Sequence, residues 1–111
     1  MPSKDVFRLD TMSDSFTLHE GENVIGRDPE ATVFVDSVKV SRHHARIMVA
    51  GTTATLEDLG SKNGTYLHGT RLTTPVRLAN TDEILIGQDI ARFRFIVEDE
   101  PTLPLGASLP E

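Results

Sequence analysis

Three observations predict an all-β fold, a β-sandwich of two sheets. Short runs of β-branched and aromatic residues recur along the chain, with apolar and polar positions alternating. Turn-forming residues separate these runs at intervals of about 8–12 residues, as in sandwich domains. No apolar pattern with helical spacing extends beyond two turns. A layered structure of short strands is therefore expected.

The strand pattern appears in segments 5–10, 16–18, 24–25, 32–35, 45–49, 53–57, 65–67, 84–86 and 91–97. About ten strands are expected in all. In the last segment the apolar residues share one face, while Arg92 and Arg94 lie on the solvated face. Residues 40–44 are interpreted as the segment that leads into the strand at 45–49. Asn63-Gly64 is a favoured pair for a tight turn.

Composition limits the possible classes of protein. The 111 residues suit one domain, and 38% hydrophobic with 25% charged residues is ordinary for a soluble globular domain. The absence of cysteine excludes disulfides, thiolate metal sites and thiol catalysis, and it fits a reducing compartment. With no signal-peptide pattern and no long apolar run, a cytoplasmic protein is expected. We expect one domain over residues 1–98 and a Pro-rich, acidic tail or linker over 99–111.

Charge is distributed unevenly. The net charge is −6, which argues against a general nucleic-acid binder. Residues 26–65 nevertheless balance, with five Lys or Arg and five Asp or Glu, so the excess of acid lies outside them. A basic spot on an acidic body suits one small anion rather than a polyanion.

Three loop segments combine turn residues with hydrogen-bond donors: 26–29 (GRDP), 40–44 (VSRHH) and 60–65 (GSKNGT). Arginine offers a rigid fork of donors that matches phosphate oxygens. Serine and asparagine add short donors, and glycine permits close backbone approaches. If the loops converge, they form a pocket for a dianionic phosphate. The donors are Arg27, Ser41, Arg42, Ser61, Lys62 and Asn63, with Gly26 and Gly64 shaping the loops.

Other chemistries fit less well. Ser41, His44 and Asp58 could form a hydrolytic triad, but no nucleophile elbow is present. In a strand, positions 41 and 44 would also point to opposite faces. His43 and His44 diverge for the same reason, and no third ligand with zinc-like spacing accompanies them. We expect no metal and no catalysis, with one histidine buried and hydrogen-bonded and the other near the surface.

The residues of these loops resemble those of the forkhead-associated (FHA) domain family. Its pattern of Gly-Arg, Ser-x-x-His and Asn-Gly is matched by Gly26-Arg27, Ser41 to His44 and Asn63-Gly64. The flanks match as well: VIGRDP (24–29), VSRHHARI (40–47), LEDLGSKNGTYLHG (56–69) and LANTDEILIG (78–87). The resemblance covers roughly residues 5–98.

The resemblance implies a sandwich of about eleven strands that recognises phosphothreonine without catalysis. It implies that Arg27 and Ser41 bind the phosphate, with assistance from Arg42, Lys62 and Ser61. Asn63 would hold the peptide main chain, and Gly26, His44 and Gly64 would support the loops. His68 departs from the common pattern, which has Asn before Gly69, and its role stays open.

The expected partner is a phosphothreonine-containing protein, such as a kinase substrate or the parent polypeptide itself. No cofactor, nucleic acid or membrane is expected to bind, and a monomer is expected. A phosphate-independent interaction or dimerisation domain of the same fold is the alternative function.

Overall fold

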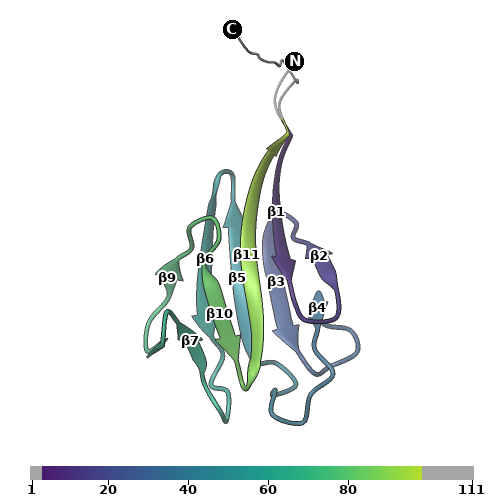
Figure 1. The fold of residues 1–111 in the computed structure, drawn as a ribbon, viewed down its shortest axis with the longest axis vertical. Helices are drawn as coiled ribbons and strands as arrows, with labels where there is room; N and C mark the ends of the chain where they lie inside the picture. Colours follow the sequence, from purple (N-terminus) through teal and green to yellow (C-terminus); the bar gives the residue numbers. More distant parts are fainter. Residues whose placement is uncertain (1–3, 99–111) are drawn as a thin grey trace, which may run out of the picture.

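The computed structural model describes residues 4–98, with side chains over residues 6–95. The expected tail at 99–111 lies outside this range. The described chain forms two sheets packed face to face, without a helix, which confirms the predicted fold class (Figure 1). Accordingly, the described part of the chain has no helix that could cross a membrane.

The six-stranded sheet contains, in spatial order, β2 (Ser15–Thr17), β1 (Lys4–Asp10), β11 (Asp89–Glu98), β10 (Glu83–Ile86), β7 (Thr65–Leu67) and β8 (Thr70–Arg71). The five-stranded sheet contains β4 (Val33–Phe34), β3 (Gly21–Gly26), β5 (Ala45–Ala50), β6 (Thr53–Asp58) and β9 (Val76–Arg77). Neighbouring strands run antiparallel, except for the parallel pair β3 and β4. The two-residue strands β8 and β9 carry no readable alternation and were not among the expected segments.

The core lies between the sheets, where alternation places the apolar residues of each strand. The five-stranded sheet contributes Ile25, Ile47 and Leu56, all without solvent exposure. The six-stranded sheet contributes residues such as Leu9 and Phe93, and the Phe93 ring stacks on Phe7 with centroids 5.5 Å apart. As expected, Arg92 and Arg94 are exposed on the outer face.

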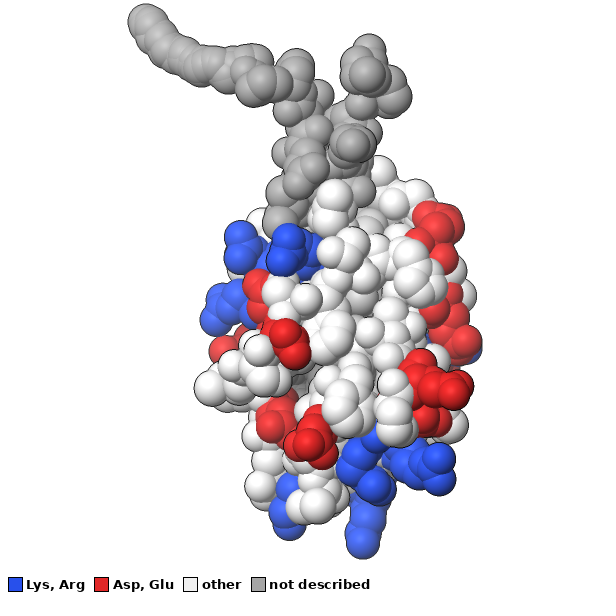
Figure 2. All heavy atoms as spheres, turned by 90° about the vertical axis from the view of Figure 1, so that its right-hand side faces the viewer, with Lys and Arg blue, Asp and Glu red and all other residues white. Residues whose placement is uncertain are grey.

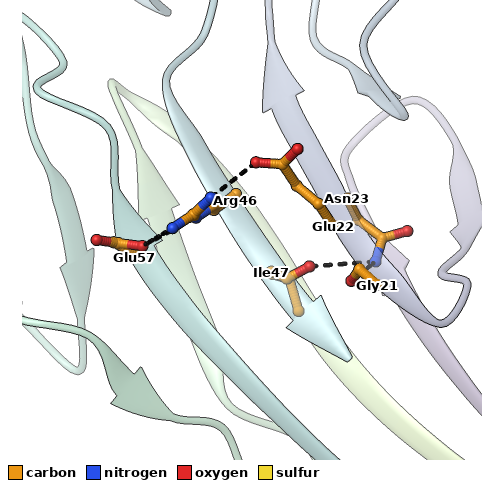
Figure 3. A network of polar contacts seen from close by, with 6 residues as sticks. All are labelled: Gly21, Glu22, Asn23, Arg46, Ile47 and Glu57. Carbon is orange, nitrogen blue, oxygen red and sulfur yellow. Dashed lines mark hydrogen bonds and ion pairs between the residues drawn. The ribbon is translucent and has the colours of Figure 1, made fainter. Parts of the chain in front are cut away.

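A polar network ties the chain entering β3 to β5 (Figure 3). The fully buried Asn23 amide donates to the carbonyls of His19, Gly21 and Ile47 at 2.8–3.2 Å, and its oxygen accepts from the His19 N–H. On the outer face, Arg46 lies between Glu22 and Glu57, at 2.9 and 2.8 Å. These contacts fix the register of the sheet that carries two of the candidate loops.

The sandwich places its chain ends and its candidate loops at opposite ends. Lys4 pairs with Glu98, so β1 enters and β11 leaves side by side at the upper end of Figure 1. The loop after β3, the segment before β5, the β6–β7 loop and the β10–β11 hairpin lie at the lower end. Loops distant in sequence therefore meet at one end.

Candidate functional site

The first two candidate loops are joined backbone to backbone. The Arg27 N–H donates to the Ser41 carbonyl at 3.0 Å, and the His44 N–H donates to the Ile25 carbonyl at 2.9 Å. A methyl group on the Cα of Gly26 would lie 1.9 Å from the Arg42 carbonyl oxygen, so only glycine permits this approach. Residues 40–44 form a loop, as expected for the second candidate segment: their backbone bonds to the first loop, and the strand that follows, β5, starts at Ala45.

His44 joins the second loop to the third. Its imidazole has no solvent exposure; Nδ1 accepts from the Ser41 N–H at 3.0 Å, and Nε2 lies 2.8 Å from the Gly64 carbonyl oxygen. These partners require a neutral ring with its proton on Nε2. His43 is exposed and lies 3.2 Å from Asp28. The expected division between one buried and one surface histidine is confirmed.

Arg27 projects from the loop with most of its donors unused. Its Nε donates to the Val40 carbonyl at 3.0 Å, which fixes the base of the guanidinium. The two terminal nitrogens have no acceptor among the described residues, and no ion pair forms with Asp28 or Glu30. The backbone N–H of Glu30 lowers the pKa of the Asp28 carboxyl, against some desolvation, and the charges of Arg42 and His43 lower it further. Arg27 thus presents a free fork at the loop end.

Ser41 is half-buried beside Arg27, and its hydroxyl oxygen accepts from the Lys62 N–H at 3.1 Å. Its own hydroxyl proton has no acceptor among the described residues, so it can donate to a ligand. The contact also brings the backbone of Lys62 next to Ser41, although the two residues are 21 positions apart.

Asn63 lies at the tip of the third loop, exposed, with Gly64 following at φ +88°. The Asn63 amide nitrogen donates to the Lys39 carbonyl at 2.8 Å. The amide oxygen has no donor among the described residues. The side chain is therefore held in place with one acceptor directed to solvent.

The third loop is built around Asp58. One carboxylate oxygen accepts from the hydroxyls of Ser61 (2.6 Å) and Thr65 (2.7 Å), and the other accepts from the N–H groups of Gly60 and Ser61. Partial burial acts to raise the pKa of Asp58, but these hydrogen bonds outweigh it, and the pKa lies below its usual value. The sequence had suggested Asp58 only as a triad member, and its role in loop structure was missed.

Ser61 differs from the other hydroxyl of the site. It is 8% exposed, its proton is donated to Asp58, and its oxygen accepts from the Gly64 N–H at 2.9 Å. A serine has one proton to donate. In this arrangement Ser61 stabilises the loop and would have to leave Asp58 to donate to a phosphate.

Positive charge gathers at this end of the molecule, where Figure 2 shows Lys and Arg side chains at the lower end; a second basic group lies at the upper left, and acidic side chains lie between the two. The loops contribute Arg27, Lys39, Arg42 and Lys62, all exposed. None has an acidic partner within 4 Å in the described part of the chain. Lys39 was not among the expected site residues. Such a surface attracts an anion of more than one charge.

The arrangement does not support hydrolysis through Ser41. Its hydroxyl oxygen is bonded to Lys62 rather than to His44, and both ring nitrogens of His44 bond to backbone groups. The Asp58 carboxylate bonds to Gly60, Ser61 and Thr65 instead. Within residues 4–98 no three metal-ligating side chains lie together.

A hollow of about 220 Å³ lies on the outer face of the six-stranded sheet, between Tyr66, Leu85 and Ile90, next to the end of the third loop. Its lining is mainly apolar, and it contains none of the expected phosphate ligands. His68 borders it, with φ +52° and with Nε2 2.9 Å from Asp82. The structure therefore places His68 in the β7–β8 turn.

Comparison with known proteins is consistent with this geometry. The family model of the FHA domain matches residues 23–87. The glycogen accumulation regulator GarA of Mycolicibacterium smegmatis is 40% identical over 73 residues, which cover 66% of this chain and 46% of GarA. The oxoglutarate dehydrogenase inhibitor of Corynebacterium jeikeium is also 40% identical, over 66% of this chain and 50% of its own. The chain thus spans about half the length of these curated relatives.

Solved structures agree. An FHA domain described for its phosphothreonine-dependent interactions matches with a TM-score of 0.76 and 32% identity, covering 80% of this chain and 95% of that one. EmbR of Mycobacterium tuberculosis, solved in complex with a low-affinity phosphopeptide, matches with a TM-score of 0.75 and 32% identity, over 80% of this chain and 24% of EmbR.

The described residues form an eleven-stranded sandwich with cationic, hydrogen-bonded loops at one end. The chain belongs to the FHA domain family.

Proposed function

We propose that this chain binds phosphothreonine-containing segments of partner proteins, with the phosphate at the free donors of Arg27 and Ser41. The observation that carries the proposal is this pair. Within the part of the chain that the structure describes, the terminal nitrogens of Arg27 and the hydroxyl proton of Ser41 have no acceptor, and both side chains are fixed by bonds to backbone groups. Phosphothreonine carries about −1.5 to −2 charges near pH 7 and three strong acceptor oxygens.

The remaining residues have graded roles in the proposal. Arg42 and Lys62 add charge around the phosphate, and Asn63 accepts a hydrogen bond from the peptide main chain. Gly26, His44, Ser61 and Gly64 hold the loops. The proposal includes no cofactor and no catalysis. The proposal places the domain in the cytoplasm, because a chain without cysteine fits a reducing compartment.

Binding in the micromolar range is expected, since charge-assisted hydrogen bonds contribute about 1.5–3 kcal/mol each before the costs of association. Preference for threonine over serine must come from the methyl group, which discriminates by roughly 10–200-fold. Aspartate and glutamate are expected to fail as mimics, since one carboxylate lacks the charge and oxygens of phosphate.

The test is calorimetric titration with degenerate phosphothreonine, phosphoserine and unphosphorylated peptide pools. Binding should be confined to the phosphothreonine pool, and Arg27→Ala and Ser41→Ala should each weaken it by about 10-fold or more. Arg77→Ala is the matched control, because Arg77 is an exposed arginine on the edge strand β9. Partner binding that survives dephosphorylation and Arg27→Ala would replace this proposal with phosphate-independent recognition.

A further inference from the structure

Arg71 lies beside the candidate site, although it is not among the residues that the sequence assigns to it. It ends β8, where it pairs with Tyr66 of β7. A methyl group on the Cα of Gly64 would lie 2.8 Å from Arg71 Nε and 3.0 Å from its Cζ. The guanidinium therefore covers the outer side of Gly64, next to Asn63.

Gly64, which Arg71 covers, is held in place by three hydrogen bonds. The Gly64 carbonyl accepts from His44 at 2.8 Å and from the Gly87 N–H at 3.2 Å, and the Gly64 N–H donates to Ser61 at 2.9 Å. A charge held over this point has a defined place relative to the loops.

The charge of Arg71 is not neutralised within the described residues. It is exposed and has no acidic partner within 4 Å there. Two other arginines of the same sheet are paired: Arg92 with Glu83 at 3.4 Å, and Arg94 with Asp10 at 3.7 Å. Arg8 of β1 bonds to the Ser15 hydroxyl and, within the described residues, also has no acidic partner within 4 Å. Of these arginines, Arg71 is the one that adjoins Asn63.

The positive charge of Arg71 is more than is needed to balance a phosphate. The loops already provide four cations without an acidic partner among the described residues, while the phosphate carries at most about two negative charges. The planar fork of arginine fits a carboxylate in bidentate fashion.

We propose that Arg71 binds an aspartate or glutamate of the ligand, so that this domain selects acidic phosphothreonine peptides. The inference rests on the proposed function and deepens it by naming the ligand class. The carboxylate lies a few residues from the phosphothreonine, since Arg71 covers Gly64, the residue after the proposed main-chain contact Asn63. Arg71 is a specificity-determining residue in this assignment, and the phosphate remains with Arg27 and Ser41.

The experiment is a phosphothreonine peptide array in which Asp, Glu, Asn or Gln occupies each flanking position in turn. The proteins are the unmodified chain, Arg71→Gln, Arg71→Lys and the control Arg77→Gln. The unmodified chain and the control should prefer Asp or Glu at one position by about 3- to 10-fold. Arg71→Gln should lose that preference while still binding the phosphopeptides that carry Asn or Gln at that position. Arg71→Lys should keep part of the preference.

The outcomes are distinct. An acidic preference that is the same in Arg71→Gln, or no acidic preference at all, would overturn the inference and leave the proposed function intact. Array binding that ignores phosphorylation and survives Ser41→Ala would overturn the proposed function, and this inference with it. Equal thermal unfolding of Arg71→Gln and the unmodified chain excludes a folding defect in the variant.

Discussion

The imidazole of His44 donates from Nε2 to the carbonyl oxygen of Gly64, 2.8 Å away, and joins two loops that are twenty residues apart in sequence. Both ring nitrogens bond to backbone, and the ring is fully buried. The position of Asn63 relative to Ser41 therefore depends on a fully buried side chain.

His44→Ala should lower the free energy of unfolding by about 2–4 kcal/mol, because it removes two buried hydrogen bonds and leaves a cavity. Urea denaturation measures this. His43→Ala is the control; it removes an exposed side chain and should change stability by less than about 0.5 kcal/mol. Equal effects of the two variants would show that the loops do not depend on the His44 contact.

Gly26→Ala should destabilise the domain by at least about 2–3 kcal/mol, because the new methyl group meets the backbone of Arg42, which cannot rotate away. Phosphopeptide binding should fall as well, since Ser41 is displaced. Gly51→Ala separates this clash from backbone strain: Gly51 has φ +63° and open space, so about 1 kcal/mol is expected. A Gly26→Ala variant as stable as Gly51→Ala would contradict the close approach.

Acid should loosen the third loop through Asp58. The pKa of this carboxyl is lowered in the folded protein, so its stabilising effect is complete above the unfolded value of about 3.9. The effect is lost as pH falls through the lower, folded value. Unfolding free energies at pH 6 and pH 3 should therefore differ more for the unmodified chain than for Asp58→Asn. At pH 6, Asp58→Asn should cost about 1.5–3 kcal/mol. If the unfolding free energy fell equally in the two proteins between pH 6 and pH 3, other carboxyls would account for the acid sensitivity.

Asn23→Ala should cost about 2–4 kcal/mol, since it leaves the buried carbonyl of Ile47 and part-buried backbone groups of His19 and Gly21 without this partner. Glu22→Ala, at the neighbouring and exposed position, removes one surface ion pair and should cost at most about 1 kcal/mol. Thermal or urea unfolding of the two variants gives the comparison; a similar cost for both would refute the importance of the buried amide.

The parts of the fold that could be predicted are those with local signals. Strands β1, β5, β6 and β11 alternate clearly, and Asn63-Gly64 marks its turn. The two-residue strands β8 and β9 have no period to detect, because their neighbours define them. Residues 40–44 do not continue the alternation of β5, and the loop after β3 takes up part of their backbone hydrogen bonding.

The same limit applies to the site. Arginine, serine and asparagine types beside glycines indicated an anion site, but the bonding partners of each side chain could not be read from spacing. Ser41 and Ser61 look alike in sequence, and only the Asp58 network shows that one hydroxyl proton is used and the other is free. Arg71 was missed because its place depends on how the β7–β8 hairpin folds back over Gly64.

The pairing of β1 with β11 determines how long a connecting segment must be for a phosphothreonine of the same polypeptide to reach the candidate loops. The described chain enters at Lys4 and leaves at Glu98 as direct partners, while the candidate loops lie at the far end of β11. Ten residues of extended strand separate the two ends of the sandwich, about 33 Å. A phosphothreonine in the same polypeptide would need a tether of at least about ten extended residues to return to the loops. A phosphothreonine fewer than about ten residues before Lys4 or after Glu98 could reach only the loops of a second molecule.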